Sequence, residues 1–331
     1  MRTGKISENV LKRSVLRRCK SRNEKVAQGP AIGQDCAIVR LDGSSFAVMH
    51  TQSVTAERVE KIRYAVLGGV NNVSCAGGEA CALMMTVLLP ITYEEAQLQE
   101  IMDCADAACQ ECGIMLAGGH TEVSEEIRVP VVTVTVQGMA GKEVHRTGEI
   151  QADLEVVMAG YPALVGTALL AKEKEAELKK RFPLELVETA MQFDTQLCMK
   201  QAARIGWDCE AAAMHDVSQG GIFGALWEFC ESGQTGLEAD LRKIPIRQET
   251  IEICEWYGWN PYQLMSGGCL LMAVPNGRKT VDQLLQAGIC ARVIGRTTAK
   301  KDRILHNGEE VRFLDKPAQD ELCHLKRIDK E

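Results

Sequence analysis

The sequence lacks any apolar run long enough to cross a membrane, and it carries no excess of positive charge. Its longest apolar run, residues 80–90, is well short of the roughly 18 residues that a membrane span needs. The formal net charge is −7, so the chain as a whole does not attract nucleic acid or an anionic membrane. A charged, helix-like stretch over residues 7–18 stands where a signal peptide would have its apolar core. We therefore expect a cytoplasmic protein that binds neither nucleic acid nor membrane.

Several catalytic signatures are also missing. The sequence has no Gly-Lys-Ser/Thr at P-loop spacing, no G-x-S-x-G elbow and no H-E-x-x-H helix. Cys109 and Cys112 have the spacing of a metal or redox pair, yet no second Cys or His pair follows at zinc-finger spacing. These absences exclude three large enzyme classes and leave a metal-thiol protein as the least favoured interpretation.

The composition indicates a globular protein of two domains. Hydrophobic residues make up 46% of the chain and charged residues 25%. The 14 cysteines have no secretory signal beside them, so we expect most to be small buried hydrophobes. Because 331 residues exceed one ordinary domain of about 150, we predict domains at residues 1–150 and 151–331.

The spacing of apolar residues predicts helices interleaved with strands in both halves, which is an α+β fold. Ser7 is a candidate helix cap, and Asp42-Gly43 and Asn307-Gly308 are hairpin signals. In the first half we expect helices at 62–73 and 94–112, and strands at 36–41, 46–51, 80–89, 114–117 and 129–136. In the second half we expect helices at 165–180, 184–205, 222–230, 247–257 and 280–287, and strands at 154–159, 237–241, 269–274 and 290–294.

The stretch from Gly118 to Glu122 directly follows a predicted helix and a predicted short strand. Gly118 and Gly119 have no Cβ atom, so a ligand or another backbone can approach them closely. His120, Thr121 and Glu122 would then lie in a loop at the exit of the strand. A plain glycine turn with polar surface residues is the alternative.

Glycine-marked polar loops recur along the chain. They are Gly33-Gln34-Asp35, residues 118–122, His215-Asp216 with Gly220-Gly221, and Ser266-Gly267-Gly268. The helix after Gly220-Gly221 offers free backbone N–H groups that suit an anion such as phosphate, although Asp216 or Ser218 could equally cap it. The residues alone therefore predict a two-domain α+β protein that binds a phosphorylated ligand.

Taken together, these loops resemble the aminoimidazole ribonucleotide (AIR) synthetase superfamily, also called PurM-like. The matching segments are residues 29–35, Asn71-Asn72, residues 118–122, Met214-His215-Asp216 with Gly220-Gly221, and residues 266–274. Their order and spacing match over nearly the whole chain. The branches most similar to it are the hydrogenase maturation protein HypE and the AIR-synthase-related proteins.

The resemblance implies an N-terminal α/β domain whose sheet pairs with a second copy in a barrel-like homodimer, and a C-terminal α+β domain. It also implies that ATP binds in the cleft between them, with Mg²⁺ or alternatively Mn²⁺. The ATP γ-phosphate would activate an oxygen of an amide, carboxamide or phosphorylated substrate, as a ligase, dehydratase or kinase-like transferase does. Phosphate charge requires both a metal ion and backbone N–H donors in such chemistry.

The family's functional residues transfer unevenly. Asp35 and Asp216 match family acids, whereas Gln52, Asn72 and His120 stand where the family has aspartates. Amides and an imidazole are weaker Mg²⁺ ligands than carboxylates. The resemblance implies nucleotide binding by Gly33, Asp35, Gln52, Asn72, Gly118, Gly119, Thr121, Gly220 and Gly221. It implies metal binding by Asp35, Asn72 and Glu122, and catalysis by His120, Glu122 and Asp216. We expect residues 118–122 to face Asp35 and Asn72 within one domain.

Two hypotheses follow. The first is an ATP-dependent enzyme that acts on an unidentified small molecule or protein. The second is a catalytically degenerate homologue that binds nucleotide and acts as a regulatory or partner-binding protein, which the amides at Gln52 and Asn72 favour. Hydrogenase maturation is disfavoured, because Cys323 lies eight residues before the end and lacks the Pro-Arg-Ile-Cys pattern of that branch.

Overall fold

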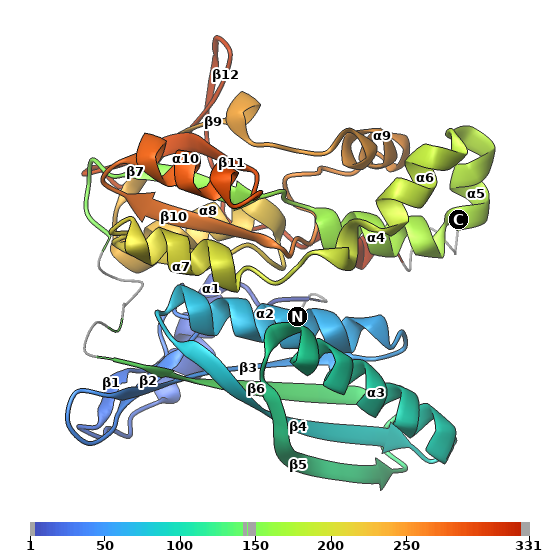
Figure 1. Cartoon of the computed structure of the whole chain (residues 1–331). Coiled ribbons are helices and arrows are strands. Elements are labelled where there is room, and N and C mark those ends of the chain that lie inside the picture. The colour runs from blue at the N-terminus through green and yellow to red at the C-terminus, as the bar shows by residue number, and fades with distance from the viewer. Residues whose placement is uncertain (1–3, 142–143, 145–149, 326–331) are drawn as a thin grey trace. The chain divides into compact units, whose positions relative to one another are not determined.

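A computed structural model of the chain describes residues 4–141, 144 and 150–325 (Figure 1). These residues form two compact units, which we name by their sheets. The six-stranded unit comprises Ser21–Pro30 and residues 35–141. The seven-stranded unit comprises residues 4–20, Ala31–Gln34 and 150–325, so the start of the chain belongs with its second half.

The six-stranded unit is one sheet with two helices on one face (Figure 1). The strand order is β1-β2-β3-β6-β4-β5, and β4 and β5 are parallel whereas the other neighbours are antiparallel. The strands are β1 Val26–Gln28, β2 Ala37–Arg40, β3 Phe46–Thr55, β4 Glu79–Pro90, β5 Met115–Ser124 and β6 Val131–Ala140, and the helices are α2 Glu60–Cys75 and α3 Glu95–Cys112.

Alternation along β6 sets the two faces of this sheet. Val132, Val134 and Val136 are fully buried beneath the helices, while Thr133 and Thr135 lie on the opposite face. Within the described part of this unit, neither helix packs on that opposite face (Figure 1). We call it the open face.

The seven-stranded unit carries helices on both faces of its sheet (Figure 1). Its strand order is β13-β12-β9-β11-β7-β10-β8. The strands are β7 Glu155–Gly160, β8 Ala213–Asp216, β9 Gly236–Asp240, β10 Cys269–Val274, β11 Ala291–Thr298, β12 Arg303–Asn307 and β13 Glu310–Phe313. The helices include α4 Leu164–Glu173, α5 Glu175–Arg181, α6 Leu184–Met191, α7 Lys200–Asp208, α8 Gly221–Gly233, α9 Gln248–Tyr257 and α10 Gly277–Gln286.

Two hydrophobic clusters stabilise this unit. One lies between α8 and the sheet and includes Phe229, Leu226 and Leu271, all fully buried. The other joins α4, α6 and α9. Because helices cover both faces of the sheet, every residue of β10 is buried, which explains its unbroken apolar run.

The mixed α+β class is confirmed, and so are most predicted elements. α3 begins with a capping box between Glu94 and Gln97 and ends at Gly113, whose φ is +64°. All 14 cysteines are free thiols, and the Cys109-Cys112 pair is buried in the core, where burial raises the pKa of Cys109 to about 11. No helix within the described ranges is long and apolar enough to span a membrane.

Two predicted helices of the second half are wrong in extent. The helix expected at residues 165–180 is divided at Lys174 into α4 and α5. The helix expected at 184–205 is α6, a short 3₁₀ turn at Phe193–Thr195, and α7. Leu197 leaves the helical path and packs, almost fully buried, against the backbone at Gly268, so tertiary packing overrides the local periodicity.

One predicted loop of the first half is regular structure. The strand β5 continues through Ser124 and does not end at residue 117, so residues 118–122 are strand and not a loop. Asn72 lies in α2, within the helix predicted at residues 62–73, and its Nδ2 donates to the Gly68 carbonyl four residues earlier. Ser7 precedes the first helix, but its side chain makes no capping hydrogen bond.

Candidate functional site

Asp35 lies just before β2, and its backbone is held by a buried histidine. The Asp35 carbonyl oxygen is 2.8 Å from Nδ1 of His50, which lies on β3 and is 9% exposed. A carbonyl oxygen only accepts, so Nδ1 is the donor of this hydrogen bond. Among the described residues, Nε2 of His50 is buried and has no hydrogen-bond partner. Sequence reasoning missed His50, because a lone histidine in a strand carries no motif.

Gln52 and Asn72 meet at the middle of α2. Gln52 donates from Nε2 to the Ala65 carbonyl at 2.6 Å, and that Nε2 also lies 3.1 Å from where a Cβ on Gly68 would stand. Asn72 donates to the carbonyl of the same Gly68 at 3.0 Å. Both amides therefore lie at Gly68, and His50 lies next to them, 3.7 Å from where a Cβ on Gly69 would stand. Asp35 is joined to this group through His50.

His120 and Glu122 lie elsewhere, on the open face at the edge strand β5. The sheet register aligns Ser53, Thr133, Thr86 and His120 in one row across four strands. His120 Nε2 is 3.1 Å from Glu122 Oε2, and both side chains are more than half exposed. Four strand spacings separate β2 from β5, about 19 Å at the usual distance between strands.

The expectation that residues 118–122 face Asp35 and Asn72 within one domain is therefore wrong. Asn72 lies in α2, which covers one face of the sheet, whereas Glu122 lies on the opposite, open face. No group of three or more His, Cys, Asp or Glu side chains with the geometry of a metal site occurs in the described ranges. The residues of one copy do not fit a metal ion shared by Asp35, Asn72 and Glu122.

The two glycines of β5 differ in the space that a side chain would have at each position. A Cβ on Gly119 would stand 1.8 Å from the Met85 carbonyl oxygen of β4. A Cβ on Gly118 would make ordinary contact with the Met84 side chain at 3.6 Å. The close approach predicted for this pair is thus a contact with the chain's own neighbouring strand at Gly119, next to the irregular pairing between Leu83 and Met84.

His215 and Asp216 end β8 and are both almost fully buried. His215 faces α8, where its Nε2 is 3.6 Å from Glu228 Oε2 and its ring stacks on Phe229. Asp216 pairs with Leu270 of β10. Burial and the charge of Asp216 raise the pKa of Cys269 well above its ordinary value.

Three backbone N–H groups at the start of α8 are paired within the protein. Gly220 donates its N–H to the Asp320 carboxylate at 2.6 Å, Gly221 donates to the Ser218 carbonyl, and Phe223 donates to the Tyr262 carbonyl. The expectation of free N–H groups is wrong for these three. The helix cap is Gly220 without a side-chain hydrogen bond, so neither Asp216 nor Ser218 caps α8.

Asp320 accepts the hydrogen bond from Gly220 at the start of α8, although it lies 100 residues further along the chain. Sequence reasoning missed this residue. It is 5% exposed and also accepts from the N–H groups of Met265 and Leu322, at 3.2 Å and 2.9 Å. Burial raises the pKa of Asp320 to about 6 even though these hydrogen bonds favour the carboxylate.

The Ser266 loop lies beside the start of α8. Ser266 donates its N–H to the Ser218 carbonyl at 3.0 Å and accepts from the Ala163 N–H at 2.7 Å through its hydroxyl. Gly268 has φ +70°, and a Cβ there would stand 2.8 Å from the Gln196 carbonyl. The His215-Asp216 and Ser266–Gly268 loops, far apart in sequence, are therefore neighbours.

Gly33 reaches the same helix. Its φ is +70°, and a Cβ there would stand 2.4 Å from the Glu228 carbonyl oxygen and 2.9 Å from the Ser232 Cβ. Three of the four predicted polar loops thus contact or adjoin α8 within the seven-stranded unit. The fourth, residues 118–122, lies on the open face of the other unit.

Two models of one protein family match the two halves of the chain. The N-terminal domain model of AIR synthase related proteins matches residues 33–140, and the C-terminal domain model matches residues 151–306. A putative hydrogenase expression/formation protein of Methanocaldococcus jannaschii is 24% identical over 78% of this chain and 77% of its own length. Carbamoyl dehydratase HypE of Rhizobium leguminosarum bv. viciae is 25% identical over 71% of this chain and 67% of its own.

Two solved structures share the fold. A hydrogenase maturation protein HypE in complex with ATP superposes with a TM-score of 0.69 at 17% identity, covering 97% of both chains. ThiL complexed with AMPPCP and TMP superposes with a TM-score of 0.69 at 18% identity, covering 86% of this chain and 92% of that one. The two domain matches and the shared two-domain fold lead to one conclusion: the chain belongs to the AIR synthase-related, PurM-like superfamily.

Proposed function

We propose that the protein is an ATP-dependent enzyme that uses the γ-phosphate to activate an oxygen of an amide, carboxamide or phosphorylated substrate. The observation that carries the proposal is the meeting of the Gly33, His215-Asp216 and Ser266–Gly268 loops at α8. Relatives with the same fold are described as a carbamoyl dehydratase and as complexes with ATP or AMPPCP. The substrate is an unidentified small molecule or protein.

In this proposal the chain's own residues bind and orient the nucleotide. Asp35 and Asp216, which match family acids, would supply hard carboxylate oxygens for the metal and phosphates. Mg²⁺, or Mn²⁺, would neutralise phosphate charge when bound. Because the donors of one copy do not form a metal site, we derive no step through a metal ion held by a single copy.

We also propose that the protein works as a homodimer joined through the open face. His120 and Glu122 lie on that face, about 19 Å across the sheet from the strand that follows Asp35. If Glu122 acts together with Asp35, the two side chains must therefore come from different copies. Pairing of two open faces would bury Met84, which is 47% exposed.

A catalytically degenerate nucleotide-binding homologue is the second candidate. The Nε2 of Gln52 and the Nδ2 of Asn72 are both engaged by carbonyl groups of α2. Gln52 therefore joins the sheet to α2, and Asn72 bonds within α2, at positions where the family has acids. In this case the protein would bind nucleotide and a partner without turnover.

Nucleotide turnover separates the two candidates. We expect Mg²⁺- or Mn²⁺-dependent ATP hydrolysis or phosphoryl transfer with some member of a broad amide and carboxylate panel. Asp35→Asn and Asp216→Asn should each lower it by about tenfold or more, whereas Asp42→Asn, in the β2–β3 hairpin turn, should leave it unchanged. Tight nucleotide binding with no turnover by wild-type protein under any condition would favour the degenerate homologue.

A further inference from the structure

The first described residues of the chain pack along α8. They form a short α-helix, α1 Glu8–Val10, followed by a π-helical turn at Leu11–Val15 and a 3₁₀ turn at Leu16–Arg18. We call residues 4–18 the N-terminal segment. It belongs to the seven-stranded unit, although about 200 residues separate it from α8 in sequence.

Lys5 of this segment reaches the carboxylate that faces His215. Its Nζ forms an ion pair with Oε1 of Glu228, whose Oε2 lies 3.6 Å from Nε2 of His215. The Lys5 side chain is half exposed, the Glu228 side chain is 18% exposed and that of His215 is 4% exposed. The three groups therefore run from the surface to the buried residue next to Asp216.

The environment keeps Glu228 ionised and in place. Burial alone would raise its pKa, but the neighbouring His215 imidazole and the charge of Lys5 lower the pKa of Glu228 to about 2. Gly33 packs against the backbone carbonyl of the same residue, so that even a methyl group there would collide. Side chain and backbone of Glu228 are thus fixed by three separate segments of the chain.

We propose that Lys5 and Glu228 are positioning residues that orient His215, and with it the adjoining Asp216, so that the N-terminal segment is a working part of the site. The inference rests on the proposed ATP-dependent function and extends it. Glu228 touches His215 and Lys5 touches Glu228, so both act through the His215-Asp216 loop.

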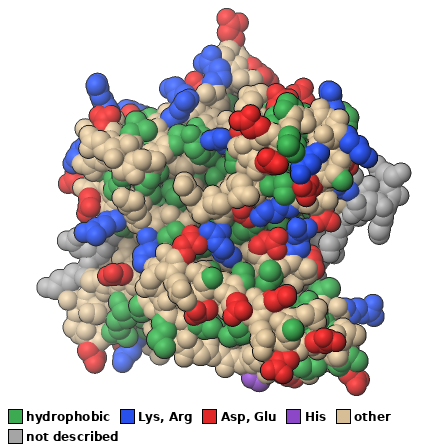
Figure 2. Space-filling model, turned by 45° about the vertical axis from the view of Figure 1, so that its right-hand side comes forward, with side chains coloured by type: hydrophobic (Ala, Val, Ile, Leu, Met, Phe, Trp, Pro, Cys, Tyr) green, Lys and Arg blue, Asp and Glu red, His purple; other side chains and the backbone are tan. Residues whose placement is uncertain are grey.

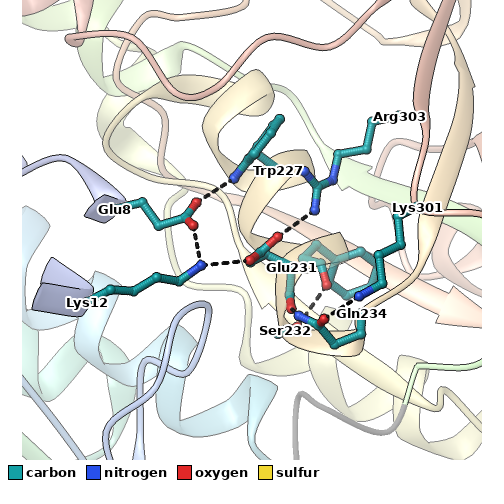
Figure 3. A network of polar contacts seen from close by, with 9 residues as sticks. Glu8, Lys12, Trp227, Glu231, Ser232, Gln234, Lys301 and Arg303 are labelled. Atoms are coloured by element: carbon teal, nitrogen blue, oxygen red, sulfur yellow. Dashed lines mark hydrogen bonds and ion pairs between the residues drawn. The ribbon is translucent and has the colours of Figure 1, made fainter. Parts of the chain in front are cut away.

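The same segment provides a matched control one turn further along α8. Lys12 is 3.0 Å from Oε1 of Glu231, whose Oε2 accepts from Arg303 at 2.7 Å (Figure 3). Glu8 accepts a hydrogen bond from Trp227 Nε1 at 3.0 Å, which is a further contact between the N-terminal segment and α8 (Figure 3). Removing Lys12 loosens the segment without touching the Glu228–His215 contact.

The test compares full-length Lys5→Met, Glu228→Gln and Lys12→Met, with Lys5→Arg as the conservative variant. We expect Lys5→Met and Glu228→Gln to weaken Mg·ATP binding by about tenfold, as loss of a residue that orients a ligand-binding group does. Lys12→Met should change it less than about twofold, and Lys5→Arg should return it to near the wild-type value. Thermal unfolding of each variant reports any general loosening of the fold.

A second readout needs no nucleotide. The imidazole nitrogen chemical shifts of His215, measured by NMR, should move in Lys5→Met and Glu228→Gln but not in Lys12→Met. If wild-type protein binds no ATP, the proposed function fails while these shifts still decide whether Lys5 and Glu228 orient His215. Equal effects of Lys5→Met and Lys12→Met on both readouts, or unmoved His215 signals, would overturn the inference.

Discussion

Folding shifts the pKa values of two carboxylates in opposite directions. Glu228 is kept ionised by His215 and Lys5, with a pKa of about 2, whereas burial raises the pKa of Asp320 to about 6. Glu228 therefore favours the folded state above its ordinary pKa of 4.5, and this contribution is lost as the pH falls toward 2. The raised pKa of Asp320 changes folding stability with pH in the opposite direction.

Asp320 should make folding stability fall as the pH rises through weak acid. Its folded-state pKa lies above the ordinary value of 3.8, so the folded protein binds the proton more tightly than the unfolded chain. The contribution is complete below about pH 4 and is lost by about pH 6, a fall of up to about 3 kcal/mol. In Asp320→Asn this part of the pH dependence should vanish, measured by urea unfolding from pH 3.5 to 7.

Asp315→Asn, an exposed change in the same segment, is the control for that experiment. It should keep the wild-type pH dependence. Identical curves for wild type and Asp320→Asn would show that Asp320 does not titrate in this range.

Gly119 should be indispensable to the packing of β5. Its Cβ would stand 1.8 Å from the Met85 carbonyl oxygen, so Gly119→Ala must push β4 and β5 apart. We expect a loss of about 1–3 kcal/mol in the free energy of unfolding, measured by chemical denaturation. Gly141→Ala, whose Cβ meets nothing within 4 Å, should cost less than about 0.5 kcal/mol. Equal costs for the two variants would contradict the register of β4 and β5.

At the scale of elements, the open face is the face of the six-stranded sheet that neither α2 nor α3 covers. Threonine and serine pairs run along it, with Thr51 3.0 Å from Thr135 and Ser53 2.7 Å from Thr133. On the side of the molecule drawn in Figure 2, acidic and basic side chains are interspersed and not gathered by sign. Within the open face itself, these hydroxyl pairs would offer hydrogen bonds to a second copy.

A charge on the open face should break the proposed homodimer. Met84→Glu places a carboxylate beside Thr135 and Gly118, and burying it unpaired should cost on the order of 3 kcal/mol. Light scattering should then give the mass of one chain for Met84→Glu and of two chains for wild type. Ile91→Glu, at an exposed residue just past β4, should stay dimeric. A monomeric wild-type protein at micromolar concentration would rule out the open face as a stable interface.

Elements with complete local signals could be predicted from the sequence, and those that depend on distant partners could not. α3 has its capping box and terminal glycine, and the Asn307-Gly308 turn joins β12 to β13, so both were found. β5 was cut short because a glycine pair signals a turn. Position 119 instead requires glycine because a side chain there would collide with the β4 backbone, about 30 residues earlier in the sequence.

At the scale of the whole molecule, the superfamily followed from five short motifs in register, and the comparisons confirm it. The candidate site was only partly accessible to sequence reasoning. Asp35 and the His215-Asp216 loop carried motifs. His50 in the six-stranded unit, and Glu228 and Asp320 in the seven-stranded unit, contact candidate residues of their own unit only when the chain is folded. The division at residues 1–150 and 151–331 stays a prediction, and the structure adds that residues 4–20 group with the second half.

The central claim is that the loops around α8 belong to a site for a nucleoside triphosphate. Calorimetric titration of the full-length protein with ATP, ADP and AMP, each with and without Mg²⁺, tests it most directly. We predict that Mg·ATP binds at least about tenfold more tightly than AMP, with affinity falling in the order ATP, ADP, AMP, because the bound metal ion stabilises the additional phosphate charge. Equal affinity for the three nucleotides, or binding of none of them, would contradict the account.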